Sequence, residues 1–197
     1  LPLMVHVDQP PPSIAEVLAR LRPGDIWTHC FRGRPNAALG ADGGPEECAL
    51  AARRRGVLFD IGHGFGSFSF DTARGMIREG FYPDSISSDV HAFSAGGPAR
   101  DLLHVATKFL NLGMPLAEVV RRVTSAPAAS IGRPDLGGLS VGTRGDAVVL
   151  SEETGQFEFH DSSGERLVGD RRLRVDSIVV QGRRWRPARP GPEGEDA

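Results

Sequence analysis

The feature that most constrains the fold is a regular alternation of short apolar stretches with helical stretches over residues 1–137. The apolar stretches end near positions 7, 30, 62 and 90. Between and after them lie stretches with helical character, at 13–21, 45–56, 70–80, 99–113 and 115–124. This alternation is typical of parallel βαβ units. The sequence therefore predicts an α/β fold in which the strands form a parallel sheet.

Local signals mark where several of these helices begin and end. Ser13 followed by Glu16 forms a capping box, in which each side chain bonds the backbone of the other residue. Gly56 and Gly80 close the second and third helical stretches. Glycine is favoured just beyond a helix because it adopts positive φ without a steric cost. These residues fix the expected helix ends.

The pattern changes near Gly138 and divides the chain into three parts. Residues 1–137 form the α/β unit, and residues 138–185 contain strand-like segments split by glycines, with no helix between them. We expect a small β appendage of short strands there. The last segment, 186–197, reads RPARPGPEGEDA and is rich in proline, glycine and charge. Such a composition predicts a disordered tail.

Charge and cysteine content exclude several classes of protein. The formal net charge of −2 and the absence of a dominant basic stripe argue against a partner that is nucleic acid. No run of eighteen apolar residues occurs, so no membrane span is expected. The two cysteines make no disulfide framework, which favours the reducing cytoplasm.

Polar side chains stand at the carboxyl ends of the predicted strands. His6, His29, His63, Asp89 and His91 all lie there. In parallel α/β folds this edge collects ligands and catalytic groups. Imidazoles together with a carboxylate suit zinc or a similar divalent ion. A single histidine in an apolar strand is more often a satisfied core residue, so the joint pattern carries the prediction.

Two other histidines and a glycine-rich motif carry less weight. His104 lies among apolar residues of a helix and is expected to be structural, and His160 is expected in an exposed turn. The motif GHGFG at 62–66 lacks the third glycine of a dinucleotide fingerprint. It predicts a phosphate site only weakly.

Six stretches resemble the amidohydrolase superfamily of metal-dependent hydrolases, in particular its dihydroorotase-like amidohydrolase/deacetylase branch. They are PLMVHVDQPP, LRPGDIWTHCF, GVLFDIGHGFGSFSF, FYPDSISSDVHAF, KFLNLGMPLAEVVRRVTSAPAASIGRP and GGLSVGTRGDAVVL. DIGHGFGSFSF and PDSISSDVHAF are the stretches specific to that branch. The resemblance extends to about Leu150.

The resemblance implies a (β/α)8 TIM-type barrel with a small β-sandwich and two metal ions, usually Zn²⁺. It maps His6 and His29 to the metal-binding histidines of strands five and six. It maps Asp89 to the strand-eight aspartate, which binds metal and acts as the catalytic proton carrier. His63, Gly64 and His91 correspond to positions near the substrate.

The family also has an H-x-H pair on strand one and a carboxylated lysine on strand four. This sequence has no H-x-H, and its only lysine is Lys108, in a later helix. We therefore expect the C-terminal half of such a barrel, strands five to eight, with part of the sandwich. As a fragment the chain is expected to be inactive and to form a homo-oligomer.

For the complete protein the sequence predicts hydrolysis of an amide or ester, most directly the deacetylation of a small acylated molecule. One alternative is a cyclic-amide hydrolase of the dihydroorotase or hydantoinase type, which would need a residue such as Arg32 or Arg34 for a substrate carboxylate. Another is a non-catalytic half-barrel that serves as an interaction module. The three ligand candidates are expected to meet in one concavity.

Overall fold

A small parallel sheet organises the first part of the chain. The computed structural model describes residues 1–92, 94 and 96–185, so the predicted tail at 186–197 lies outside the described residues. Strands β1 (Met4–Val5), β2 (Ile26–Trp27) and β3 (Leu58–Phe59) pair in parallel in the order β1-β2-β3. The predicted α/β class and parallel pairing are confirmed for these strands.

Six helices are described, and five of them coincide with predicted helical stretches. They are α1 (Ile14–Leu18), α2 (Glu47–Arg54), α3 (Phe70–Arg78), α4 (Leu102–Asn111), α5 (Leu116–Val123) and α6 (Ser125–Ser130). Both hydrogen bonds of the capping box between Ser13 and Glu16 are present at α1. Gly56 and Gly80 follow α2 and α3 with φ of 90° and 70°. Helix α6 is the one that the sequence did not predict.

The prediction that the fourth apolar stretch, DSISSDVHAF at 84–93, forms a full strand is wrong for the described residues of that segment. They form only an isolated parallel bridge, Asp60 to Ser85, and Phe93 lies outside the described residues. The segment still runs beside the extension of β3, because the amides of His63 and Gly64 donate to the carbonyls of Ser87 and Ser88 at 3.1 and 3.0 Å. Positive φ at Asp89 (46°) turns the backbone out of the extended conformation that a strand needs.

The β appendage consists of two long strands and a short one, instead of several short strands. Strands β4 (Ala147–His160), β5 (Arg166–Val180) and β6 (Arg183–Trp185) form an antiparallel sheet. Gly155 lies at a register shift, and a Cβ at Gly169 would come within 2.2 Å of the Asn111 Oδ1 atom. These glycines allow a bulge and a close approach of α4, and neither one ends a strand.

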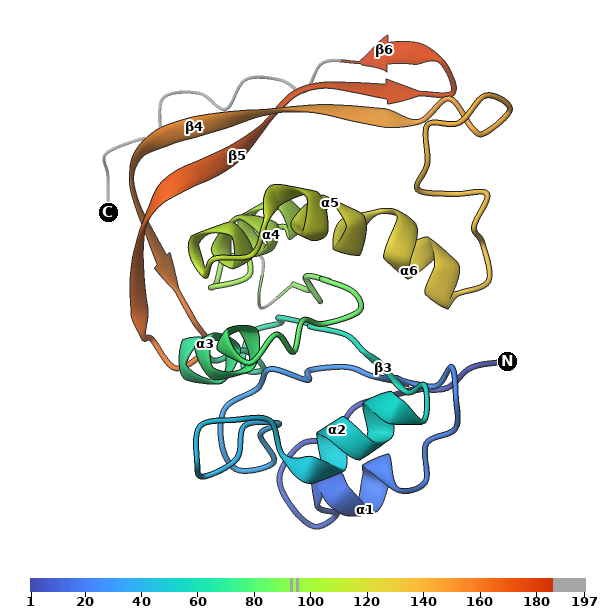
Figure 1. The fold of residues 1–197 in the computed structure, drawn as a ribbon. Coiled ribbons are helices and arrows are strands. Elements are labelled where there is room, and N and C mark those ends of the chain that lie inside the picture. Colours follow the sequence, from blue (N-terminus) through green and yellow to red (C-terminus); the bar gives the residue numbers. More distant parts are fainter. Residues whose placement is uncertain (93, 95, 186–197) are drawn as a thin grey trace.

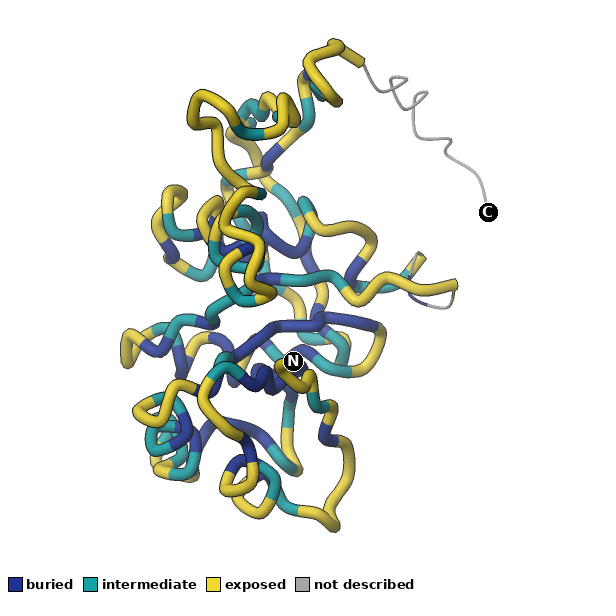
Figure 2. Tube along the Cα trace, turned by 90° about the vertical axis from the view of Figure 1, so that its right-hand side faces the viewer, coloured by how far each residue is buried: buried dark blue, intermediate teal, exposed yellow. Residues whose placement is uncertain are grey.

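The β4–β5 hairpin curves over α4 and α5, and its turn reaches α3 (Figure 1). At that turn the Asp161 carboxylate accepts a hydrogen bond from the Phe70 amide at 2.9 Å. Buried residues run through the interior of the α/β part, whereas much of the hairpin is exposed (Figure 2). Every helix among the described residues is too short or too polar to cross a membrane.

Aromatic side chains fill the core between the parallel strands and their helices. Trp27 on β2 and Phe81 each meet the ring of Phe59 on β3 edge to face, with ring centroids 5.7 and 5.0 Å apart. All three side chains are buried. This packing joins β2 and β3 and positions the residues that follow them.

Candidate functional site

Two of the predicted metal ligands meet at the carboxyl ends of neighbouring strands. His6 follows β1, and His29 follows β2. Their rings lie edge to face, with centroids 4.7 Å apart. The parallel register, in which Val5 is opposite Trp27, brings the two ends to the same edge. The prediction that these histidines converge is therefore supported by the geometry.

His29 is oriented as a metal-binding imidazole. Its Nδ1 lies 2.5 Å from the carbonyl oxygen of Gly62, so Nδ1–H donates and Nε2 is the nitrogen that can bind an ion. Burial lowers the pKa of His29, and the nearby Asp89 charge partly opposes this. The ring is therefore neutral at pH 7, the form that metals require.

The third predicted ligand, Asp89, lies against the same loop. A Cβ built on Gly64 would stand only 2.7 Å from the Asp89 Oδ2 atom, so the carboxylate packs directly on this glycine. Both Asp89 and His29 adopt positive φ, 46° and 62°. Such conformations are uncommon outside glycine and concentrate at functional sites. The loop 62–64 thus contacts both His29 and Asp89.

The buried carboxylate of Asp60, which the sequence analysis did not single out, links β2, the end of β3 and the segment at 85–87. Asp60 accepts hydrogen bonds from the hydroxyls of Thr28 at 2.8 Å, Ser85 at 2.5 Å and Ser87 at 2.8 Å. The Ser87 hydroxyl in turn accepts from the Gly62 amide at 2.9 Å. The spacing of Ser85 and Ser87, two residues apart, was the available signal, since such residues point the same way along extended chain.

His63 occupies a different environment from the one predicted for it. It is fully buried and stacks on Phe68 with ring centroids 4.5 Å apart. Its Nε2 lies 2.7 Å from Lys108 Nζ, and its Nδ1 lies 3.0 Å from the Gly64 carbonyl. Both ring nitrogens are engaged within the protein, so this geometry favours a supporting role over direct contact with substrate.

Lys108 is buried beside His63 in the interior of the fold. Besides His63, its ammonium donates to the carbonyls of Pro98 at 2.6 Å and His160 at 2.7 Å. Burial lowers the pKa of Lys108 to about 7. Burial, and then the neighbouring Lys108 charge, lowers the pKa of His63 to about 3. Sequence reasoning placed Lys108 on its helix and gave it no role.

The remaining histidines lie elsewhere. His91 is exposed, and its amide donates to the Ser94 hydroxyl at 2.8 Å, so its contact with substrate stays a prediction. The side chain of His160 is exposed as expected, but the residue ends β4 instead of lying in a turn. It pairs with Glu158 at 3.1 Å.

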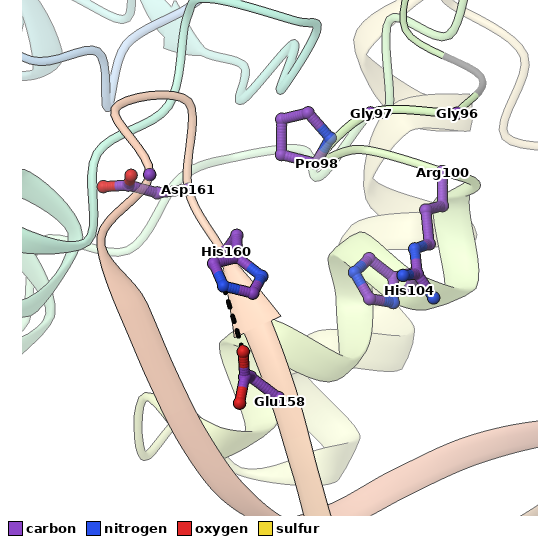
Figure 3. A pocket seen from close by; sticks show the side chains of 9 residues that line it. Gly96, Gly97, Pro98, Arg100, His104, Glu158, His160 and Asp161 are labelled. Carbon is purple, nitrogen blue, oxygen red and sulfur yellow. Dashed lines mark ion pairs between the residues drawn. The ribbon is translucent and has the colours of Figure 1, made fainter. Parts of the chain in front are cut away.

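A hollow at the junction of the hairpin with α4 involves none of the ligand candidates. Figure 3 shows His160 and Glu158 on one wall and His104 with Arg100 on the other. The residues that line it are Gly96, Gly97, Pro98, Arg100, His104, Glu158, His160, Asp161 and Gly164. His104 therefore lines this hollow and also contacts the ring of Phe159 at 5.2 Å, in keeping with its expected structural role.

The donor chemistry fits part of a site for one divalent ion. Two adjacent imidazoles and a nearby carboxylate are ligands that zinc accepts. Among the described residues, no group of three or more His, Cys, Asp or Glu side chains is already arranged to hold a metal. Lys108 is committed to the interior and does not face His6 or His29 as a bridging ligand would.

Comparison with known proteins places these features in context. No protein-family model matches the chain. A deacetylase of Brucella anthropi is 39% identical over 165 residues, which are 84% of this chain and 41% of that protein. A deacetylase of Enterococcus faecalis is 34% identical over 184 residues, 92% of this chain and 50% of that protein. The chain spans about half the length of these relatives or less.

Two solved structures are also similar to most of this chain. A crystal structure of an adenine deaminase superposes with a TM-score of 0.91 and 34% identity, and one of a dihydroorotase with a TM-score of 0.86 and 35% identity. Each match covers 94% of this chain and 51% of the other chain. The similarities to both sets of proteins extend over most of this chain and indicate the amidohydrolase superfamily.

Proposed function

We propose that this chain supplies ligands and the general base to the active site of a metal-dependent hydrolase that removes an acyl group from a small molecule. The observation that carries the proposal is the contact of His6 with His29 at 4.7 Å, beside the loop on which Asp89 packs. Zinc is the ion that we expect, with two ions in the complete site. Names of similar proteins as deacetylases support a hydrolase.

Each residue has a task that follows from its surroundings. A bound divalent ion would supply Lewis acidity and lower the pKa of a water molecule. His29 would bind through Nε2, because Gly62 holds its Nδ1–H. His6 would bind from the adjacent strand end. Asp89 would accept a proton at its carboxylate and return it to the leaving group.

Deacetylation is favoured over hydrolysis of a cyclic amide by the placement of Arg32, one of the two arginines that could bind a substrate carboxylate. Arg32 is buried and bonds Asp8 at 2.5 Å and the Val7 carbonyl, and Arg34 donates to the Gly40 carbonyl at 3.0 Å. The Arg32 guanidinium is therefore held by partners within the protein, whereas Arg34 is exposed and makes this single hydrogen bond. The structural similarity to a dihydroorotase keeps the cyclic-amide hydrolase as the second candidate.

The test compares four variants of the intact protein that contains this chain. His6→Ala and His29→Ala should each reduce zinc binding, measured by calorimetry and metal analysis. Asp89→Asn should lower turnover of N-acetylated amino acids by about 10²–10⁴-fold while the thermal melt stays near that of the wild type. His160→Ala, a change at an exposed histidine of the hairpin, is the matched control.

Near-normal turnover by Asp89→Asn with zinc bound would remove the assigned base. Zinc binding that is unchanged by both histidine variants would favour the non-catalytic interaction module. Turnover of dihydroorotate or hydantoins, with none of acetylated substrates, would select the cyclic-amide hydrolase.

A further inference from the structure

We propose that Lys108 is a positioning residue for the site: its buried ammonium fixes His63, and through the loop 62–64 it sets the placement of His29 and Asp89. The inference rests on the proposed function, because it concerns the residues assigned there to metal binding and proton transfer. It adds a residue that lies outside that site, on α4.

The Lys108 ammonium joins three separate segments of the chain. Its side chain is fully buried, and its acceptors are His63 Nε2, the Pro98 carbonyl and the His160 carbonyl. These belong to the loop after β3, the segment before α4 and the end of β4. An ammonium group has three N–H donors, and each one finds an acceptor at 2.6–2.7 Å.

The contacts also decide where the His63 proton lies. If His63 carried its proton on Nε2, its bare Nδ1 would face the lone pairs of the Gly64 carbonyl at 3.0 Å. With the proton on Nδ1, that contact becomes a hydrogen bond, and Nε2 accepts from Lys108. The arrangement therefore assigns the Nδ1–H tautomer to His63, and Lys108 selects it.

The two neighbours of His63 in the loop, Gly62 and Gly64, each contact a candidate ligand, so the position of His63 affects both ligands. On one side, the Gly62 carbonyl accepts from His29 Nδ1 and so orients that ring. On the other side, Gly64 forms the surface on which the Asp89 carboxylate rests. A shift of His63 would therefore move the partner of His29 and the support of Asp89 together.

A role in folding alone does not account for the charge. An apolar side chain of similar length would fill the same volume without the cost of taking an ammonium out of water. Phe68, which stacks on His63, shows that the surroundings are apolar. The charge is explained when a fixed direction for the His63 ring is part of what the site needs.

The experiment uses Lys108→Met in the intact protein, with Asn111→Ala as the control. Asn111 lies one turn further along α4 and joins the same helix to the hairpin, through hydrogen bonds with Asp170 at 3.0 Å and with Arg171 at 2.9 and 3.2 Å. The other hydrogen bond of its side chain is to the Thr107 carbonyl within α4, at 2.9 Å. The readouts are nitrogen NMR of the histidine rings, the amide shifts of Gly62 and Gly64, and zinc affinity.

We expect an Nδ1-protonated His63 in the wild type. Lys108→Met should change that ring signal, move the amide signals of Gly62 and Gly64, and weaken zinc binding by about tenfold, the lower end of the effects seen for partners of metal ligands. Asn111→Ala should lower the melting temperature and leave these signals and the zinc affinity unchanged.

An Nε2-protonated His63 in the wild type overturns the inference, and so do equal effects of the two variants on the loop signals. If Lys108→Met does not fold, the wild-type ring alone is the test: protonation on Nδ1 supports the inference, and protonation on Nε2 overturns it. Should the wild type bind no zinc, the proposed function fails, whereas the ring and amide signals still test the positioning by Lys108.

Discussion

At the scale of single residues, the site depends on backbone conformations that most side chains avoid. His29 and Asp89 both adopt positive φ, and they are two of the three predicted ligands. Gly64 adopts a φ of 54° and leaves room for the Asp89 carboxylate. Strain at these residues persists because the surrounding hydrogen bonds hold it in place. Position 64 therefore has no room for even the smallest side chain.

Gly64→Ala should disturb the site more than it disturbs the fold. The new Cβ would stand 2.7 Å from Asp89 Oδ2 and force the carboxylate away. We expect turnover to fall by at least about tenfold, which is the usual loss when a residue that supports a metal ligand is changed. The positive φ should cost about 1–2 kcal/mol of stability. Steady-state kinetics and chemical denaturation measure the two effects.

Gly66→Ala is the matched control, two residues further along the chain. Nothing lies within 4 Å of the position of its Cβ, and its φ is not positive. Turnover by this variant should stay within about twofold of the wild type, which corresponds to less than about 0.5 kcal/mol in activation free energy. Equal losses in both variants would show that the loop tolerates no side chain anywhere, and the specific contact with Asp89 would lose its support.

At the scale of elements, the hairpin β4–β5 is joined to the α/β part by its turn. The Asp161 carboxylate accepts from the Phe70 amide at the start of α3, and also from the amides of Ser163 and Glu165 within the turn. A carboxylate near a helix N-terminus is favourable because the first amides of a helix lack partners. One side chain thus shapes the turn and attaches it to α3.

Asp161→Ala should lower the free energy of unfolding by about 2–4 kcal/mol, because it leaves the buried Phe70 amide and the part-buried amides of Ser163 and Glu165 without their acceptor. Asp170→Ala, at an exposed position on β5 of the same hairpin, should stay within about 0.5 kcal/mol of the wild type. Urea denaturation followed by circular dichroism compares the two. A loss of less than about 1 kcal/mol in Asp161→Ala would mean that water replaces the carboxylate at little cost.

At the scale of the whole molecule, buried titratable groups meet where the hairpin, α4 and the loop after β3 come together. Burial, and then the Lys108 charge, lowers the pKa of His63 to about 3 and the pKa of His104 to about 4. Both values lie below the value of about 6.5 for an unfolded chain. The unfolded state therefore binds more protons between these values, and stability must fall as the pH falls through this range.

We expect the free energy of unfolding to be about 2–4 kcal/mol smaller at pH 5 than at pH 7. Lys108 contributes in the same direction, because its folded pKa of about 7 is also below its unfolded value. Urea denaturation at pH 7, 6 and 5 measures the slope. His104→Gln should reduce it by about half and leave the contact of Lys108 with His63 in place. A stability that is independent of pH over this range would contradict the buried, neutral state of both rings.

Several features of this protein are settled by local sequence. The capping box at Ser13, the helix ends before Gly56 and Gly80, and the parallel pairing of apolar stretches all follow from interactions over a few residues or from one-dimensional patterns. The convergence of His6 and His29 also follows, because the carboxyl ends of neighbouring parallel strands meet at one edge. The pattern of residues is sufficient in each case.

Other features depend on contacts between residues far apart in the chain, and only the tertiary structure decides them. Asp60 gathers hydroxyls from 25 to 32 residues away, and Lys108 reaches His63 across 45 residues and His160 across 52. No local pattern predicts these partners, because a buried polar side chain forms hydrogen bonds with whichever groups the fold brings near it. The family resemblance placed His63 near a substrate, and the fold encloses its side chain in the core.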